Sequence, residues 1–157
     1  MTIRTSTVAD PWMALGLASH FVARQPSFGA FTADSLIRTL DAQIRRKHYL
    51  FAFDTSAAPA RVVGYFGWAL YDHASAEAFA RTGISPKHEF DEGGDVIWLM
   101  TAASVNRPAF FALVNAARAL YPHHRVMAIR NRADGRRTPI DQSRARVRER
   151  GAGNAPA

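Results

Sequence analysis

The sequence predicts one α/β domain with a mixed sheet, and three observations support this. Residues 49–53 and 61–71 are rich in aromatic and β-branched residues and are separated by a turn-forming stretch, which predicts an antiparallel hairpin. Residues 96–103 form a nearly continuous apolar segment, typical of a strand buried on both faces. A helical segment and another strand follow it, so we expect a right-handed parallel crossover.

Two helices are predicted before the hairpin. Asp10 and Pro11 form a good helix start, because a carboxylate caps free amides and proline tolerates the first position; this helix should reach about residue 24. Its expected buried face consists of Met13, Ala14, Leu17, Ala18, Phe21 and Val22. Thr32 is expected to cap a second helix that runs through about residue 47. The apolar stripe of this second helix consists of Leu36, Leu40 and Ile44.

After the hairpin, residues 75–82 predict a short helix and residues 83–94 a loop. The buried strand at 96–103 carries one interior side chain with chemistry to offer, Thr101. A third amphipathic helix is expected at 109–120 and a strand at 125–130. We therefore predict a folded domain over residues 1–130 and a basic tail, partly helical and with a disordered end, over 131–157.

Composition bounds the class of protein. A chain of 157 residues fits a single domain, and zero cysteines exclude disulfides and thiol chemistry. The longest apolar run is about half the roughly 20 residues that a membrane-spanning helix requires. We therefore expect a cytoplasmic protein that does not span a membrane. The net charge of +7 suits an acidic partner, which can be a nucleic acid, an anionic lipid surface or an acidic protein.

Four short segments, in order and at matching spacing, resemble the lysine acyltransferases that activate RTX toxins. They are Leu15-Gly16, Gly67-Trp68-Ala69, Gly94-Asp95-Val96-Ile97-Trp98 and Ala128-Ile129-Arg130. The resemblance implies an acetyltransferase-like (GNAT-like) fold. It also implies transfer of a fatty acyl group from acyl carrier protein to a toxin lysine, with a catalytic histidine and an aspartate. A histidine oriented by a carboxylate suits this chemistry, because the lysine ammonium must lose a proton before it attacks.

Neither of the family's catalytic residues is present at the matching positions. Phe28 stands where the resemblance places the histidine, and Thr101 stands where it places the aspartate, three residues after Trp98. A structural role accounts for both residues if Phe28 packs against the core and Thr101 bonds to nearby backbone. His20, on the first helix, is the nearest substitute base, although a surface histidine is the plainer interpretation. The histidines show no zinc-ligand spacing, so no metal site is predicted.

The resemblance also bears on the acyl donor and on the protein partner. Acetyl-coenzyme A enzymes of this fold place a glycine-rich turn where residues 103–107 read Ala-Ser-Val-Asn-Arg, so no coenzyme A site and no other cofactor is indicated. Acyl carrier proteins are acidic, and Arg45, Arg46, Lys47 and Arg130 are the candidate docking residues, although a solvated basic helix end is the plainer interpretation. The arginines of the tail lack interleaved aromatics, so only nonspecific nucleic-acid binding is expected of them.

Two functional hypotheses follow. The chain is an RTX toxin-activating acyltransferase that uses acyl carrier protein, or it is a noncatalytic relative that binds acyl carrier protein, a toxin or a second copy of itself as a homodimer. The motifs favour the first hypothesis, and Phe28 and Thr101 favour the second.

Overall fold

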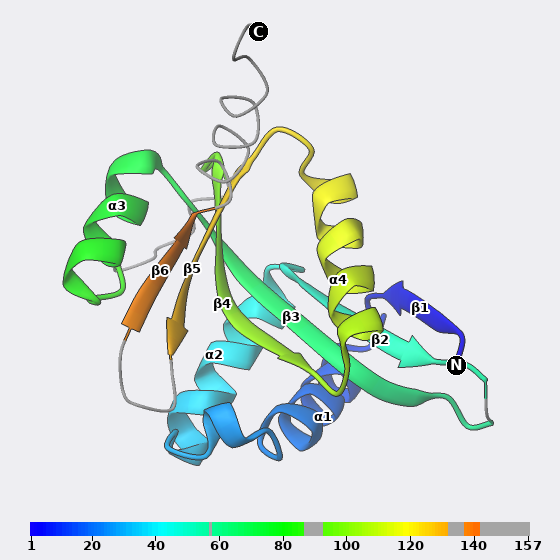
Figure 1. The fold of residues 1–157 in the computed structure, drawn as a ribbon. Helices are drawn as coiled ribbons and strands as arrows, with labels where there is room; N and C mark the ends of the chain where they lie inside the picture. Colours follow the sequence, from blue (N-terminus) through cyan, green and yellow to red (C-terminus); the bar gives the residue numbers. More distant parts are fainter. Residues whose placement is uncertain (57, 87–92, 132–136, 142–157) are drawn as a thin grey trace, which may run out of the picture. The chain divides into compact units, whose positions relative to one another are not determined.

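Figure 1 shows the computed structural model, which describes residues 1–56, 58–86, 93–131 and 137–141. The helices are α1 (Pro11–Val22), the 3-10 helix η1 (Pro26–Phe28), α2 (Ala33–Arg45), α3 (His73–Thr82) and α4 (Arg107–Leu120). The strands are β1 (Ile3–Ser6), β2 (Tyr49–Asp54), β3 (Arg61–Tyr71), β4 (Val96–Ser104), β5 (Arg125–Asn131) and β6 (Arg137–Asp141). The strands are hydrogen-bonded to one another in sequence order.

The chain divides into two compact units. The first consists of Met1–Ala69 and Met100–Pro122, and the second of Leu70–Leu99 and His123–Ala157. The strands β3 and β4 each contribute residues to both units.

In the first unit, α1 and α2 begin at the caps that the sequence predicts. The Asp10 carboxylate accepts a hydrogen bond from the Met13 amide at 2.7 Å, and the Thr32 hydroxyl accepts one from the Ser35 amide at 3.2 Å. The predicted stripe of α2 is buried, but Met13 is 60% exposed, so its assignment to the buried face of α1 is wrong. Met13 lies in the first turn of α1, and the buried residues of this helix are Ala14, Ala18, Phe21 and Val22.

Helices cover both faces of the antiparallel strands β1, β2 and β3. Side chains alternate along a strand, so Tyr65 and Phe66 of β3 point to opposite faces. Tyr65 belongs to the core cluster formed with α1 and α2, whereas the Phe66 ring lies 5.3 Å from that of Phe110 on α4. At Gly64, on the same face as Phe66, a Cβ would lie 2.8 Å from Leu113 Cδ1, so this glycine allows α4 to approach closely.

In the second unit, β4 pairs in parallel with β5 from Val96 opposite Arg125 to Leu99 opposite Ala128, which confirms the predicted crossover. The α3 helix follows the Asp72 cap and begins at His73, two residues before the predicted start. It ends at Thr82, and the positive φ of 71° at its C-cap, Gly83, favours glycine. The Trp98 ring stacks on that of Phe79 at 4.5 Å.

Two strands were not predicted. Residues 137–141, which the sequence analysis places in the tail, form β6, antiparallel to β5. The β6 sequence RTPID is too polar to predict a strand, and the strand is stabilised by its pairing with β5. The strand β1 has only four residues, which is too short for a periodic signal. The boundary at residue 130 stays a prediction, and the arginine-rich residues 142–157 lie outside the described part of the chain.

Candidate functional site

Thr101 belongs to a buried polar cluster in the first unit, in which Gln43 bonds both Thr101 and Tyr65. The Thr101 Oγ1 accepts a hydrogen bond from Gln43 Nε2 at 3.0 Å, and the Tyr65 hydroxyl donates to Gln43 Oε1 at 2.9 Å. Exposure is 1% for Thr101, 4% for Gln43 and 0% for Tyr65. Burial, with a smaller effect from Tyr49, raises the pKa of Tyr65 above its ordinary value, so the phenol stays protonated and can donate. Gln43 thus bonds both hydroxyls, one through its amide nitrogen and the other through its carbonyl oxygen.

The cluster depends on a glycine opposite Gln43. A Cβ at Gly67 would overlap the Gln43 carboxamide, so the glycine leaves the space that this side chain fills. Gln43 is not among the predicted site residues, although the sequence carries a signal for it. Gln43 lies three residues after Leu40 and directly before Ile44, so it is a polar residue on the apolar stripe of α2.

This geometry does not give Thr101 a base. Its hydrogen-bond partner is a carboxamide, which cannot accept the proton of a nucleophilic hydroxyl. The expectation that Thr101 bonds to nearby backbone is wrong, because the structure gives it a side-chain partner 58 residues away. Its predicted burial is confirmed.

Phe28 lies in η1, is half-buried, and packs against the core cluster, as the structural interpretation expected. Its ring lies 5.6 Å from that of Phe31. The resemblance pairs positions 28 and 101, but their neighbours differ: Phe28 contacts apolar side chains and Thr101 an amide. His20 is exposed in the last turn of α1.

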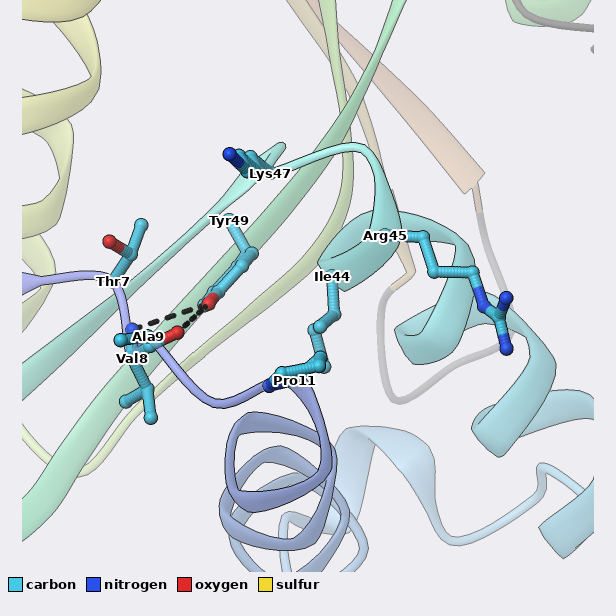
Figure 2. A pocket seen from close by; sticks show the side chains of 8 residues that line it. All are labelled: Thr7, Val8, Ala9, Pro11, Ile44, Arg45, Lys47 and Tyr49. Carbon is cyan, nitrogen blue, oxygen red and sulfur yellow. Dashed lines mark hydrogen bonds between the residues drawn. The ribbon is translucent and has the colours of Figure 1, made fainter.

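The candidate docking cations occupy the end of α2 and one position on β5. Arg45 is exposed and forms an ion pair with Asp41, Nε to Oδ2, at 2.8 Å. Arg46 is the C-cap of α2 and is half-buried, and Lys47, which follows it, is exposed. Arg130 is an exposed residue of β5 in the second unit. Arg45 and Lys47 also line a pocket, shown with its other lining residues in Figure 2.

The turn between β4 and α4 is the place where a coenzyme A pyrophosphate would require free backbone amides. The Val105 amide instead donates to the Val63 carbonyl at 3.0 Å, and the Asn106 side chain accepts from the Ala109 amide at 2.9 Å. The Phe110 amide donates to the Asn106 carbonyl, and Pro108 has no amide hydrogen. Four of the six residues from 105 to 110 therefore offer no free amide hydrogen at this turn.

The second unit holds a carboxylate–histidine pair that the sequence analysis missed. His73 Nε2 lies 2.9 Å from Asp95 Oδ2, and His73 Nδ1 lies 3.2 Å from Arg125 Nη1. An arginine can only donate, so Nδ1 accepts and the Nε2 hydrogen points to Asp95. Both ring nitrogens are occupied, so His73 in this arrangement presents no free nitrogen as a base. Arg125 also binds Asp141 and Glu77, at 2.6 and 3.2 Å.

Comparison with known proteins identifies the class of fold. No family model and no curated protein matches the sequence. A GphF GNAT-like decarboxylase solved in complex with isobutyryl-CoA has a TM-score of 0.54 and 17% identity, covering 99% of this chain and 79% of that one. The fold is GNAT-like. A histone acetyltransferase HPA2-related acetyltransferase from Corynebacterium glutamicum has a TM-score of 0.50 and 16% identity, covering 99% of this chain and 88% of that one.

At these identities the likeness establishes the GNAT-like fold, and the closer resemblance to RTX toxin-activating enzymes stays a prediction. In the described part of the chain, no group of three or more histidine, aspartate or glutamate side chains is placed to hold a metal ion. No helix in the same part is long and apolar enough to cross a membrane.

Proposed function

We propose that this chain is an acyltransferase that takes a fatty acyl group from acyl carrier protein and transfers it to a lysine of a protein, as RTX toxin-activating enzymes do. The GNAT-like fold supports acyl transfer. The choice of acyl donor depends on the turn at the start of α4, where the amides of Val105 and Ala109 already donate hydrogen bonds within the protein. A donor held by protein contacts does not need those amides.

Charge supports an acidic carrier. The chain has a net charge of +7, and Arg45, Arg46, Lys47 and Arg130 are the residues proposed to dock the carrier. Surface cations of this kind steer an acidic partner and contribute mainly to the association rate.

The reaction requires few groups from the protein. The lysine ammonium gives up a proton, its nitrogen forms a bond to the thioester carbonyl carbon, and the carbon–sulfur bond breaks. The nitrogen loses a second proton as the amide forms, and the departing thiolate of the carrier takes up this proton. Since Phe28 and Thr101 cannot remove the first proton, His20 is the substitute base in this proposal.

A second candidate function is that of a noncatalytic binding module for acyl carrier protein or a toxin. The bonded Thr101 hydroxyl and the packed Phe28 favour it, because both positions are filled by residues with structural roles. In this case the basic residues still recruit an acidic partner.

One experiment separates the two functions. The full chain is incubated with acyl carrier protein that bears a labelled acyl chain and with a candidate RTX-type toxin, and labelled lysines are located by mass spectrometry. If the wild-type chain transfers the label and the His20→Ala variant does not, the acyltransferase function is supported. A stable complex with the carrier but no label supports the binding module. If neither label nor complex forms, while an authentic toxin-activating enzyme labels the toxin, both proposals are refuted.

A further inference from the structure

The first unit contains a pocket of about 620 Å³ that the proposed acyl transfer does not explain. It lies between the loop that leads into α1, the end of α2 and the start of β2 (Figure 2). Its size is in the range of sites for small organic ligands. Val8, Pro11 and Ile44 give it apolar walls, its two charged lining residues, Arg45 and Lys47, are cationic, and no lining residue is acidic.

The backbone of Lys47 is in a conformation that lysine adopts rarely. Its φ is 57°, in the left-handed region, directly after the C-cap of α2. Its amide donates to the Ile44 carbonyl at 3.0 Å, as in the usual helix ending for which glycine is preferred. A Cβ is disfavoured there, so the fold alone would select glycine. A strained residue at the rim of a pocket indicates a role for its side chain.

The two cations of the pocket are not equivalent. Arg45 is paired with Asp41, and in Figure 2 its side chain extends away from Tyr49. Lys47 has no ion-pair partner among the described residues, so its ammonium is available to an anion. The nearby C-terminus of α2 carries partial negative charge, which weakens the binding of any anion and of a multiply charged one most.

Tyr49 forms a wall of the pocket and is already bonded. Its hydroxyl donates to the Val8 carbonyl at 2.7 Å and accepts from the Val8 amide at 3.2 Å. These bonds hold the loop before α1 against β2, so the pocket is built by the fold. Lys47, another lining residue, contributes a positive charge.

From these observations we propose that the pocket binds an organic monocarboxylate with an apolar body. The carboxylate pairs with the Lys47 ammonium, and the apolar body lies along Val8, Pro11 and Ile44. A lysine side chain of a target protein does not fit, because two cations would repel it. The site requires neither a carrier protein nor acyl transfer, so it stands or falls independently of the proposed function.

The probe is octanoate, titrated into the full chain and followed by NMR chemical shifts and calorimetry. We expect saturable binding at one site, with shifts at Val8, Ile44 and Tyr49. Octylamine and octanol match the apolar body without the negative charge, and we expect no binding at this site. If octylamine or octanol perturbs the same residues with equal affinity, the proposal is wrong.

Variants at position 47 separate charge from folding. Lys47→Gly removes the ammonium and relieves the backbone, so octanoate affinity should fall about tenfold while Tm rises by about 2–4 °C. Lys47→Arg should keep the affinity within about threefold, because the charge remains. Arg38→Gln is the matched control, since Arg38 lies on the outer face of α2, paired with Asp34, and does not line the pocket. Unchanged affinity in Lys47→Gly, or a loss of equal size in Arg38→Gln, would overturn the proposal.

A second arm identifies the source of the carboxylate. A short peptide with an apolar C-terminal residue is compared with the same peptide amidated at its C-terminus. Binding by the free peptide alone identifies a chain terminus as an acceptable ligand, whereas binding by octanoate alone identifies a fatty acid. Equal binding of the free and amidated peptides at this pocket would contradict recognition of a carboxylate.

Discussion

The substitution Gly67→Ala tests the buried cluster around Thr101 most directly. The new Cβ would overlap the carboxamide of Gln43, so this side chain must swing away and lose its bonds to Thr101 and Tyr65. Each buried polar group left unsatisfied costs about 1–3 kcal/mol, and two hydroxyls lose their partner. The smaller conformational entropy of the unfolded alanine variant offsets about 0.4–1 kcal/mol. The expected loss in free energy of unfolding is therefore about 1–6 kcal/mol.

Urea unfolding, followed by circular dichroism, measures this loss. The double variant Gly67→Ala/Gln43→Ala should be no less stable than Gln43→Ala alone, because the alanine at 43 removes the overlap. Gly16→Ala is the control: no atom lies within 4 Å of its added Cβ, so this change in α1 should stabilise the chain. Additive losses in the double variant, or a Gly67→Ala protein as stable as the wild type, would refute the structural reasoning.

Three further predictions concern other residues. Thr101→Val should lower the free energy of unfolding by about 1–3 kcal/mol, because the buried side-chain amide of Gln43 loses its acceptor. The rate of any acyl transfer should stay within about twofold of wild type. A large loss of transfer with unchanged stability would assign Thr101 a catalytic role. Arg125→Ala should lower the free energy of unfolding by about 2 kcal/mol and speed amide hydrogen exchange in β6, because the ion pair between Arg125 and Asp141 is lost. Unchanged exchange in β6 would contradict a role of this ion pair in holding the strand. Bonds from the Ser75 hydroxyl and amide lower the pKa of Asp72, so its stabilisation is present above the carboxylate's unfolded pKa and lost as pH falls through the folded value. An NMR titration of Asp72 at its ordinary pKa would contradict this, and Asp72→Asn should flatten the acid side of the stability profile.

Local signals in the sequence predict much of the fold. The Asp10 and Thr32 caps, the apolar stripe of α2 and the hairpin each depend on residues close together in the chain, so short-range patterns suffice. The parallel pairing of β4 with β5 follows from the order strand, helix, strand and the handedness of such crossovers. In contrast, β6 depends on its partner strand and on the ion pair of Asp141 with Arg125, which composition does not show.

The polar contacts of the candidate site could not be predicted in the same way. Gln43 meets Thr101 across 58 residues and Tyr65 across 22, and only the folded sheet brings them together. The sequence predicts that Thr101 is buried, but it cannot supply the partner. The same limit applies to His73, whose contacts Asp95 and Arg125 come from separate elements.

The bonded turn at the start of α4 also limits how this chain can evolve. Asn106→Ala would release the Ala109 amide, but losing the cap costs about 1 kcal/mol before any ligand compensates for it. Pro108 would have to change to supply a further amide, and Val105 would remain bonded to Val63. A route to nucleotide binding therefore passes through less stable intermediates, so natural selection on single substitutions tends to keep the turn closed.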